Sequence, residues 1–534
     1  MAKCARLDYE GAVSIRELKK EAAERGLEDY LSKANNKSAN PQTGIKAAVI
    51  GAGPAGLSAA YFLSKAGFGV TVFEKSDRAG GTVQHVIPAF RLPQSAIDKD
   101  IEFVKQFGVK FIYNSDPNFS ISKLERAGFK YLFIGIGATQ SNHLDFTGSN
   151  IYEAIDFLKS FNQNAGISIG ENVAVIGGGN SAIDAARASL RIKGVKKVYI
   201  LYRRTIEFMP ADKEELDSAV AEGVIFKELL LPVSFNDKKL ICRQMQLGET
   251  DIDGRRKVLP LENRFVEFEI DSVISAIGEH TDWNILGENN IVDSGGTLPI
   301  VDYETNETKI KNIYIGGDAL RGPSTVIESI ADGKKAAESI IMKEEIQFDE
   351  SETFSEAIAA NEKIKSIQDR RGNIFINKPL DSNKEAERCL ECNLLCNKCV
   401  EVCPNRANIA IKTGTIEDSL KDFYQILHLD GLCNECGNCQ TFCPYTDAPY
   451  KIKTTLFRTK EDFLDSENDG FYFERSEKGA NNFIVRYNST LGNVSFNPEG
   501  EIIYSSFGEA SKELSTFSNL IRAVFTSYDY LVQK

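Results

Sequence analysis

Two segments of the chain have the pattern of a strand, a glycine-rich turn and a helix, and this repeated pattern constrains the fold most. They are IKAAVIGAGPAG at 45–56 and ENVAVIGGGNSA at 171–182. In βαβ units that bind nucleotides, glycines permit the tight turn, the approach of backbone N–H groups to a pyrophosphate and the close packing of helix on strand. We therefore predict an α/β fold with two Rossmann-like nucleotide-binding domains.

The first turn contains Gly51, Gly53 and Gly56. The strand after it ends in Glu74, about 20 residues beyond the last glycine, where a carboxylate can accept hydrogen bonds from ribose hydroxyls. The alternative is a packing turn that binds no ligand. The other candidate cofactor-binding residues around this turn are Pro54, Ala55, Lys75, Arg78, Gly80 and Gly81.

The second turn contains Gly177, Gly179 and Ala182, and the strand that follows it ends differently. Arg203 and Arg204 stand about 20 residues after Ala182, where guanidinium groups can bind a 2′-phosphate through forked hydrogen bonds. This pattern predicts a site for NADPH. The alternative is that both arginines are solvated surface charges. Three further candidates in the turn are Gly178, Asn180 and Ser181.

Nine of the 11 cysteines lie between 389 and 443. Such clustering favours metal ligation in a reducing compartment over scattered disulfides. The downstream four have the spacing of a bacterial ferredoxin, C-x2-C-x2-C-x3-C-P, in which the fourth cysteine serves the other cluster. They are Cys433, Cys436, Cys439 and Cys443, and the upstream five are Cys389, Cys392, Cys396, Cys399 and Cys403.

The preferred ligand assignment is two [4Fe-4S] clusters with one spare upstream cysteine, Cys389. An exchange of roles between Cys389 and a neighbour stays open, and two zinc sites are the alternative. Cys4 and Cys242, outside this region, are expected to be inert thiols. One cluster takes Cys392, Cys396, Cys399 and Cys443, and the other takes Cys433, Cys436, Cys439 and Cys403.

Composition and charge exclude several function classes. The chain carries 63 Lys and Arg against 76 Asp and Glu, a net charge of −13. It has no basic stretch to match the phosphates of nucleic acid or an anionic membrane. The first thirty residues lack the apolar core of a signal peptide, and the uncharged run at 47–64 contains the first glycine-rich turn. We expect a cytoplasmic protein without a membrane span.

The pattern along the chain predicts six regions. A helix over 15–25 lies within the first of them, because Ser14 and Glu17 form a capping box and Gly26 can end it. The regions are an N-terminal helical arm and linker (1–44), a first nucleotide-binding domain (45–150 and 290–343) interrupted by the second (151–289), a charged linker (344–386), an α+β two-cluster ferredoxin-like domain (387–460), and a small mixed β/α tail (461–534).

Four longer motifs resemble the small (beta) subunit of glutamate synthase and its relatives, flavoprotein NADPH oxidoreductases with iron-sulfur clusters. They are FEKSDRAGG at 73–81, IPAFRLP at 87–93, VAVIGGGNSAIDAAR followed by YRRTIEFMPA, and IYIGGDALRGPSTVIESIADGKKAA at 313–337. The resemblance covers about residues 45–343. It implies FAD at the first turn and NADPH at the second.

The resemblance also implies cofactor roles for residues far from both turns. Asp318 matches a GGD motif whose acid contacts the ribityl and pyrophosphate region of FAD. Thr325 and Val326 open a helix whose N-terminus faces the flavin ring, where its dipole favours negative charge. GIGA at 135–138 departs from the family's usual Ala-Thr-Gly. The remaining residues that the resemblance implies as cofactor contacts are Arg91, Gly137, Gly278 and Gly317.

The order of the two nucleotide-binding domains and the C-terminal cysteines is similar to a family of selenate reductase subunits, of which this chain matches the C-terminal half. Relatives of the glutamate synthase type carry cluster cysteines before the FAD domain, whereas this chain has Cys4 alone there. The resemblance implies that NADPH reduces FAD and that electrons pass through the clusters to a separate catalytic reductase subunit or acceptor protein in a hetero-oligomer.

By resemblance, the final acceptor is selenate or another oxyanion, or a purine or pyrimidine. We nominate no catalytic acid or base, because the cofactors carry the chemistry. Two alternatives stay open: an iron-sulfur scaffold or binding subunit that never turns over, and electron flow in reverse from a partner to NADP+.

Overall fold

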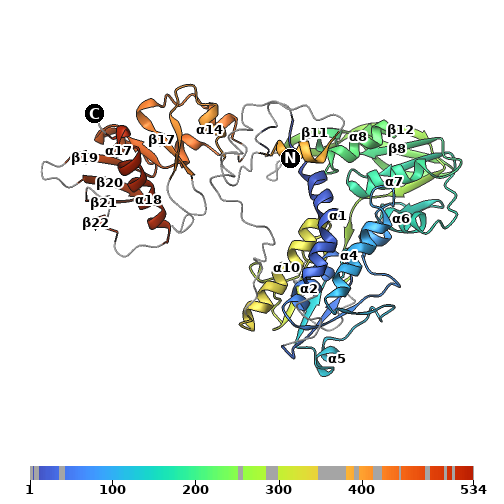
Figure 1. The fold of residues 1–534 in the computed structure, drawn as a ribbon. Helices are drawn as coiled ribbons and strands as arrows, with labels where there is room; N and C mark the ends of the chain where they lie inside the picture. Colours follow the sequence, from blue (N-terminus) through green and yellow to red (C-terminus); the bar gives the residue numbers. More distant parts are fainter. Residues whose placement is uncertain are drawn as a thin grey trace. The chain divides into compact units, whose positions relative to one another are not determined.

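The computed structural model divides into two compact units (Figure 1). Unit 1 comprises Met1–Glu28 and Thr353–Lys534, and unit 2 comprises Asp29–Glu352. The structure describes residues 4, 6, 11–34, 43–250, 256–283, 299–346, 380–389, 396–412, 424–443, 445, 447–475, 481–497, 502–507 and 512–532.

Unit 2 contains a first parallel sheet of five strands in the order β15-β4-β1-β2-β3. The chain leaves this sheet after β4 and returns to it at β15, so distant segments share one sheet. The strands are β1 (Lys46–Ile50), β2 (Gly69–Phe73), β3 (Lys110–Ile112), β4 (Tyr131–Ile134) and β15 (Ile313–Ile315), and the helices are α2 (Pro54–Lys65), α3 (Thr82–His85), α4 (Gln94–Gln106), α5 (Ile121–Arg126), α9 (Asp318–Arg321) and α10 (Val326–Lys343).

Between β4 and β15 the chain forms a second parallel sheet in the order β6-β13-β7-β8-β9. Its strands are β6 (Ile151–Glu153), β7 (Asn172–Ile176), β8 (Lys197–Tyr202), β9 (Ile225–Glu228) and β13 (Ser272–Ser275), and its helices are α6 (Ala154–Asn162), α7 (Asn180–Leu190) and α8 (Lys213–Ala221). A smaller antiparallel sheet contains β10 (Leu230–Asn236), β11 (Lys239–Thr250) and β12 (Arg256–Glu269), and a two-stranded one pairs β5 (Gln140–Ser141) with β14 (Glu279–His280).

The central strands of both parallel sheets are almost continuously apolar because helices cover them on both faces. Residues 47–50 of β1 and 173–176 of β7 are all buried. Helices α2 and α10 lie side by side in Figure 1 and pack closely. Gly333 permits this contact, since a Cβ atom there would lie 2.1 Å from the carbonyl oxygen of Ala55.

Unit 1 is built on one seven-stranded sheet in the order β16 to β22. Helix α18 contributes Leu520, Ile521 and Val524 to the same core as Phe471 and Phe483. The strands are β16 (Asn408–Lys412), β17 (Tyr424–Leu429), β18 (Thr455–Phe457), β19 (Gly470–Arg475), β20 (Asn481–Tyr487), β21 (Thr490–Phe496) and β22 (Ile502–Ser505), and the helices are α12 (Ser382–Glu387), α14 (Lys398–Glu401), α15 (Asn438–Thr441), α16 (Pro449–Ile452), α17 (Lys460–Asp465) and α18 (Lys512–Ser527).

Two features differ from the sequence-based expectations. The sheet of unit 1 continues across residue 460, where we expected a ferredoxin-like domain to end and a separate tail to begin. Helix α1 (Ile15–Ala34) continues past Gly26, where we expected it to end. The hydroxyls of Tyr30 and Tyr61 lie 2.7 Å apart, and this packing favours the longer helix. The other domain boundaries stay predictions.

Among the described residues, no helix has the length and apolar character needed to cross a membrane.

Candidate functional site

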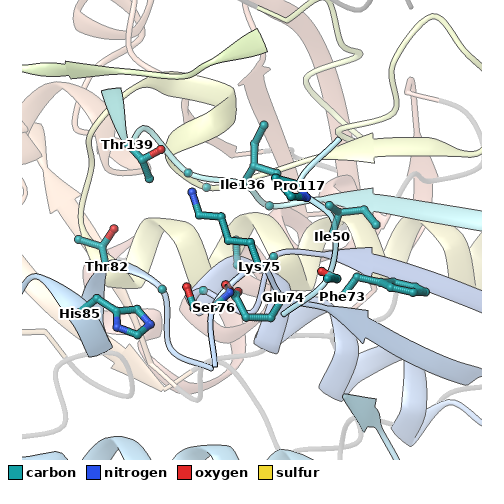
Figure 2. Close-up of a pocket in the computed structure, with 18 of the residues that line it drawn as sticks. Ile50, Phe73, Glu74, Lys75, Ser76, Thr82, His85, Pro117, Ile136 and Thr139 are labelled. Atoms are coloured by element: carbon teal, nitrogen blue, oxygen red, sulfur yellow. Dashed lines mark hydrogen bonds between the residues drawn. The ribbon is translucent and has the colours of Figure 1, made fainter. Parts of the chain in front are cut away.

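The first glycine-rich turn opens onto a cavity of about 1050 Å³ in unit 2. The turn contributes Gly51, Gly53, Pro54 and Ala55 to its lining, and α10 contributes Val326 at another wall. Figure 2 shows Lys75 reaching across the cavity, with Thr82 and His85 on one side and Ile50 and Phe73 on another. A cavity of this size accommodates a large organic cofactor.

Two glycines of this turn, and Gly81 opposite it, occupy positions where a Cβ atom would clash with the backbone. Gly51 has a φ of +97°, and a Cβ atom there would lie 2.4 Å from the carbonyl oxygen of Gly135. At Gly56 a Cβ atom would lie 2.0 Å from the carbonyl oxygen of Gly51. Gly81 has a φ of +56° and faces Gly53. The glycines therefore keep two backbone segments close together and leave their N–H groups accessible.

Glu74 lines the cavity at the end of β2, although its side chain is largely buried. One carboxylate oxygen accepts a hydrogen bond from Ala52 N at 2.8 Å, and the other accepts one from Ser76 N at 2.8 Å. A carboxylate has about four acceptor sites, so each oxygen can still accept a bond from a ligand hydroxyl. Arg78, by contrast, is exposed and is not among the lining residues.

The segments that follow β4 and β15 form other walls of the cavity. Gly137 and Gly317, each with a φ of +71°, line it together with Asp318. The Asp318 carboxylate accepts hydrogen bonds from Ser324 N at 3.0 Å and Ser324 Oγ at 2.8 Å, while burial raises its pKa. Thr325 caps α10 through a capping box and is not a lining residue.

Several polar side chains of the cavity were not predicted from the sequence. Thr82, Thr139 and Ser329 line it, and His85 does so with an Nε2 atom that is buried and has no hydrogen-bond partner within the described parts of the chain. A buried polar atom without a partner is rare in native proteins. The residue that carries it is one of the lining residues of the cavity. Nothing local in the sequence marks these positions.

The second turn has the same backbone pattern, but the space beside its middle glycine, Gly179, is open. A Cβ atom at Gly177, whose φ is +146°, would lie 2.2 Å from the carbonyl oxygen of Ala276, and one at Gly178 would contact the ring of Tyr202. Gly179 caps α7, and no atom of the residues that the structure describes lies within 4 Å of a Cβ atom at this position. The open position leaves the first N–H groups of α7 available to an anion.

Polar residues hold the start of α7 in place. Asn180 Oδ1 accepts a hydrogen bond from Asp212 N at 2.9 Å. The hydroxyl of Ser181 donates to Glu279, next to Gly278 with its φ of +109°. Burial raises the pKa of Glu279, which the sequence analysis had not selected.

Both arginines of the second turn directly follow β8. Gly177 N donates to Leu201 O at 3.1 Å, so the end of this strand lies against the turn. Arg203 is exposed, and no partner of its guanidinium is found in the described part of the chain. Arg204 is partly buried, and its Nε donates to Arg256 O at 3.0 Å. Arg203 is therefore the more available of the two for a phosphate.

Arg91 has contacts other than those implied by the resemblance. It does not line the cavity, and its guanidinium pairs with Asp184 and Glu215 on α7 and α8.

In unit 1, four of the predicted cysteine ligands line one small hollow: Cys403, Cys433, Cys436 and Cys439. These are the four that the preferred assignment gives to one cluster. Helices α14 and α15, which carry Cys399 and Cys439, pack against each other. Among the described residues, no group of three or more His, Cys, Asp or Glu side chains is placed to hold a metal ion.

The second predicted ligand set is only partly described. Cys396, Cys399 and Cys443 are described together with Cys389, whereas Cys392 lies outside the described residues. Burial raises the pKa of Cys399 to about 11. Burial also raises the pKa of the distant Cys242 to about 12, which keeps that thiol protonated and unreactive.

Curated proteins similar to this chain are named as oxidoreductases or their subunits. The YgfK protein of Escherichia coli (strain K12), named as an oxidoreductase, is 38% identical over 539 residues, which cover 99% of this chain and 50% of that protein. The beta subunit of an NADP(+)-dependent formate dehydrogenase of Moorella thermoacetica is 37% identical over 311 residues, covering 56% of this chain and 44% of that protein. The chain thus spans about half the length of these two relatives.

The NADPH glutamate synthase small chain of Azospirillum brasilense is 32% identical over 358 residues, covering 62% of this chain and 72% of that protein. Among solved structures, a mutant of FprA from Mycobacterium tuberculosis superposes with a TM-score of 0.50 at 18% identity, over 57% of this chain and 85% of that one. This likeness shows the fold alone. The family model described as pyridine nucleotide-disulphide oxidoreductase matches residues 45–333. Since that match covers more than half of the chain, and the parallel sheets and glycine-rich turns lie within it, the chain belongs to the pyridine nucleotide-disulphide oxidoreductase family.

Proposed function

We propose that this protein is the electron-input part of a larger reductase: it transfers electrons from NADPH through FAD to two [4Fe-4S] clusters and on to a partner subunit. The observation that carries the proposal is the cavity of unit 2, which Glu74, His85 and the Gly317-Asp318 segment line together. FAD, when bound, supplies the ability to accept a hydride and to release electrons singly, which neither nicotinamide nor a cluster combines.

The residues around the cavity fit FAD by their chemistry. The N–H groups at the start of α2 suit a pyrophosphate, and Glu74 suits ribose hydroxyls. Asp318 lies beside Gly317, where it suits the polyol part of the cofactor, and the N-terminus of α10 supplies a positive dipole end. Val86 and Ile87 are apolar lining residues that exclude water from a ring system. Of the remaining candidates, Lys75 lines the cavity and Gly80 precedes the close approach of Gly81 to Gly53.

The second turn fits NADPH. The open Gly179 leaves room for a pyrophosphate at α7, and the exposed Arg203 suits a 2′-phosphate. Two relatives support this choice of nucleotide by their names, which include NADP(+) and NADPH.

The cysteine hollow of unit 1 supports one [4Fe-4S] cluster. Its four thiols come from two sequence segments in the crossed pattern of two-cluster ferredoxins. The second cluster, with Cys392, Cys396, Cys399 and Cys443, rests on the sequence spacing.

A partner is supported by the names of the relatives, which are subunits or small chains. We place the conversion of the final acceptor on that partner. An oxyanion such as selenate, or a purine or pyrimidine, is the acceptor class that the resemblance favours.

Anaerobic purification and titration test the proposal. The protein should contain about one flavin and about eight irons per chain, and both chromophores should bleach on addition of NADPH. If flavin and clusters are present but unchanged by NADPH, the scaffold alternative holds. Reduction by a partner followed by formation of NADPH from NADP+ would instead favour the reverse direction.

Two cysteine variants sharpen the assignment of the clusters. Cys436→Ala should lower iron to about four per chain, because Cys436 lines the hollow. Cys389→Ala is the matched control and should keep about eight. Iron loss in the control and not in the first variant would contradict the ligand assignment.

A further inference from the structure

Arg91 joins the segment after α3 to the helices of the second parallel sheet. Its Nη1 donates to both carboxylate oxygens of Asp184, at 2.7 and 2.9 Å, and its Nη2 lies 3.1 Å from Glu215 Oε1. The segment that carries Arg91 begins with Val86 and Ile87, which line the cavity. A single side chain therefore connects a cavity wall to α7 and α8.

Asp184 is placed where this connection affects the second turn directly. It lies on the first turns of α7, whose cap is Gly179 of that turn. Its side chain is 6% exposed, so the ion pair with Arg91 is largely shielded from water. A movement of Arg91 is therefore transmitted to the start of α7.

Additional contacts make the connection rigid. Arg187 bonds Glu215 at 2.5 Å and Glu222 at 2.7 Å, and Phe90 lies 5.1 Å from the Arg187 guanidinium. On the other side of the segment, Asn162 of α6 donates from Nδ2 to the carbonyl oxygens of His85 and Ile87, at 3.2 and 3.0 Å. The segment 85–91 is thus fixed to α6, α7 and α8 at separate points.

The energetics of this pair favour a role in positioning over a role in stability. Burial raises the pKa of Asp184 to about 6, although Arg91 acts in the opposite direction. The charged carboxylate is therefore costly where it lies, and buried ion pairs often contribute little net stability. What such a pair does supply is a fixed geometry.

We propose that Arg91 is a positioning residue, whose pair with Asp184 holds the second glycine-rich turn at the correct place relative to the cavity. This inference rests on the proposed function, because the groups so aligned are nicotinamide and flavin. Hydride transfer is sensitive to errors of about 1 Å, which can reduce a rate about 100-fold. Arg91 acts through α7 and does not bind FAD itself.

The test uses the full-length protein with its cofactors and two variants that break the same pair from opposite sides. Arg91→Met removes the guanidinium, and Asp184→Asn removes the charge without changing the shape of the side chain. Both should keep the wild-type flavin content. Both should slow flavin reduction by saturating NADPH about 10- to 100-fold in anaerobic stopped-flow measurements, and Arg91→Lys should recover part of the rate.

Arg191→Met is the matched control, since Arg191 pairs with Glu222 and stacks on Phe90 but does not contact Asp184. It should retain nearly the wild-type rate. Loss of flavin from Arg91→Met but not from Asp184→Asn would show that Arg91 is a cofactor ligand and overturn the inference. Wild-type rates in both variants would also overturn it. If wild-type flavin itself is not reduced by NADPH, the proposed function fails instead. Asp184→Asn keeps the inference testable if Arg91→Met does not fold.

Discussion

The two glycine-rich turns of unit 2 have the same sequence pattern but differ in what surrounds them. At the third position, Gly56 has no room for a Cβ atom, whereas Ala182 carries one and is fully buried. At the second position, Gly53 faces Gly81, whereas no atom lies near Gly179. The first turn packs closely against the backbone at Gly81 and Gly135, whereas the space beside the middle glycine of the second turn is open. This suits a cofactor that stays bound and a nucleotide that must exchange.

The helices after the two turns differ at an equivalent position, two residues after Gly56 and Ala182. Ser58 Oγ donates to Ile330 O at 2.7 Å within the first domain. Asp184 instead pairs with Arg91, 93 residues away. The neutral bond joins two helices next to the first parallel sheet, whereas the ionic one joins the segment after α3 to a helix of the second parallel sheet. Equivalent positions on two similar helices thus make different contacts with distant segments.

The largest expected effect compares the third positions of the turns. Gly56→Ala should remove most of the bound flavin, because its Cβ atom would lie 2.0 Å from the backbone oxygen of Gly51. Ala182→Gly at the equivalent position should keep the flavin and cost roughly 0.5–1 kcal/mol of stability. Flavin absorbance per chain after purification measures both. If Gly56→Ala retains the wild-type flavin content, the predicted difference between the third positions of the two turns is wrong.

The second prediction separates the two arginines of the open turn. Arg203→Ala should raise the KM for NADPH roughly 10- to 100-fold and leave the KM for NADH nearly unchanged, because a charge-assisted hydrogen bond to a phosphate contributes about 1.5–3 kcal/mol. Arg204→Ala should have a smaller effect on the ratio of the KM for NADPH to the KM for NADH, since the Nε of Arg204 already donates to Arg256 O. Steady-state kinetics with NADPH and NADH measure both KM values. If the ratio of the two KM values is unchanged in both variants, the prediction of a 2′-phosphate site is wrong.

The smallest expected effect concerns the pH dependence of stability at the two helix positions. The pKa of Asp184 in the folded state, about 6, lies above the ordinary 3.8, so the folded protein binds more protons between these values. Wild type should therefore lose stability as pH rises from about 4 to 6. Asp184→Asn should lack this pH-dependent loss, because its amide does not titrate.

Denaturant unfolding at several pH values measures this difference, with Ser58→Ala as the control. That variant should lose about 1 kcal/mol at every pH, because it removes one neutral hydrogen bond. If the stability of Asp184→Asn does not vary between pH 4 and 6 and its flavin is reduced more slowly, the titration of Asp184 and its positioning role are both supported. A difference in stability between wild type and Asp184→Asn that stays constant from pH 4 to 6 would contradict the raised pKa of Asp184.

Much of the fold was predictable because its signals are local. The strand, turn and helix at each glycine pattern lie close to the expected residues, and Glu74 follows the end of β2 and lines the cavity. Contacts between distant segments were not predictable from local patterns. Arg91 pairs with a residue far along the chain, and β18 joins β17 and β19 in parallel, so that the predicted tail and ferredoxin-like region share one sheet.

Short motifs alone indicated which chemistry to expect: two glycine-rich turns, an acid after one and arginines after the other, and thiols at ferredoxin spacing. These properties depend on residue type and short spacing, which any reader of the chain can see. Only the tertiary structure decided that the cavity includes His85, that Arg91 pairs with Asp184, and that Cys403 meets the downstream thiols. Those contacts join residues brought together by packing, and packing depends on the whole fold.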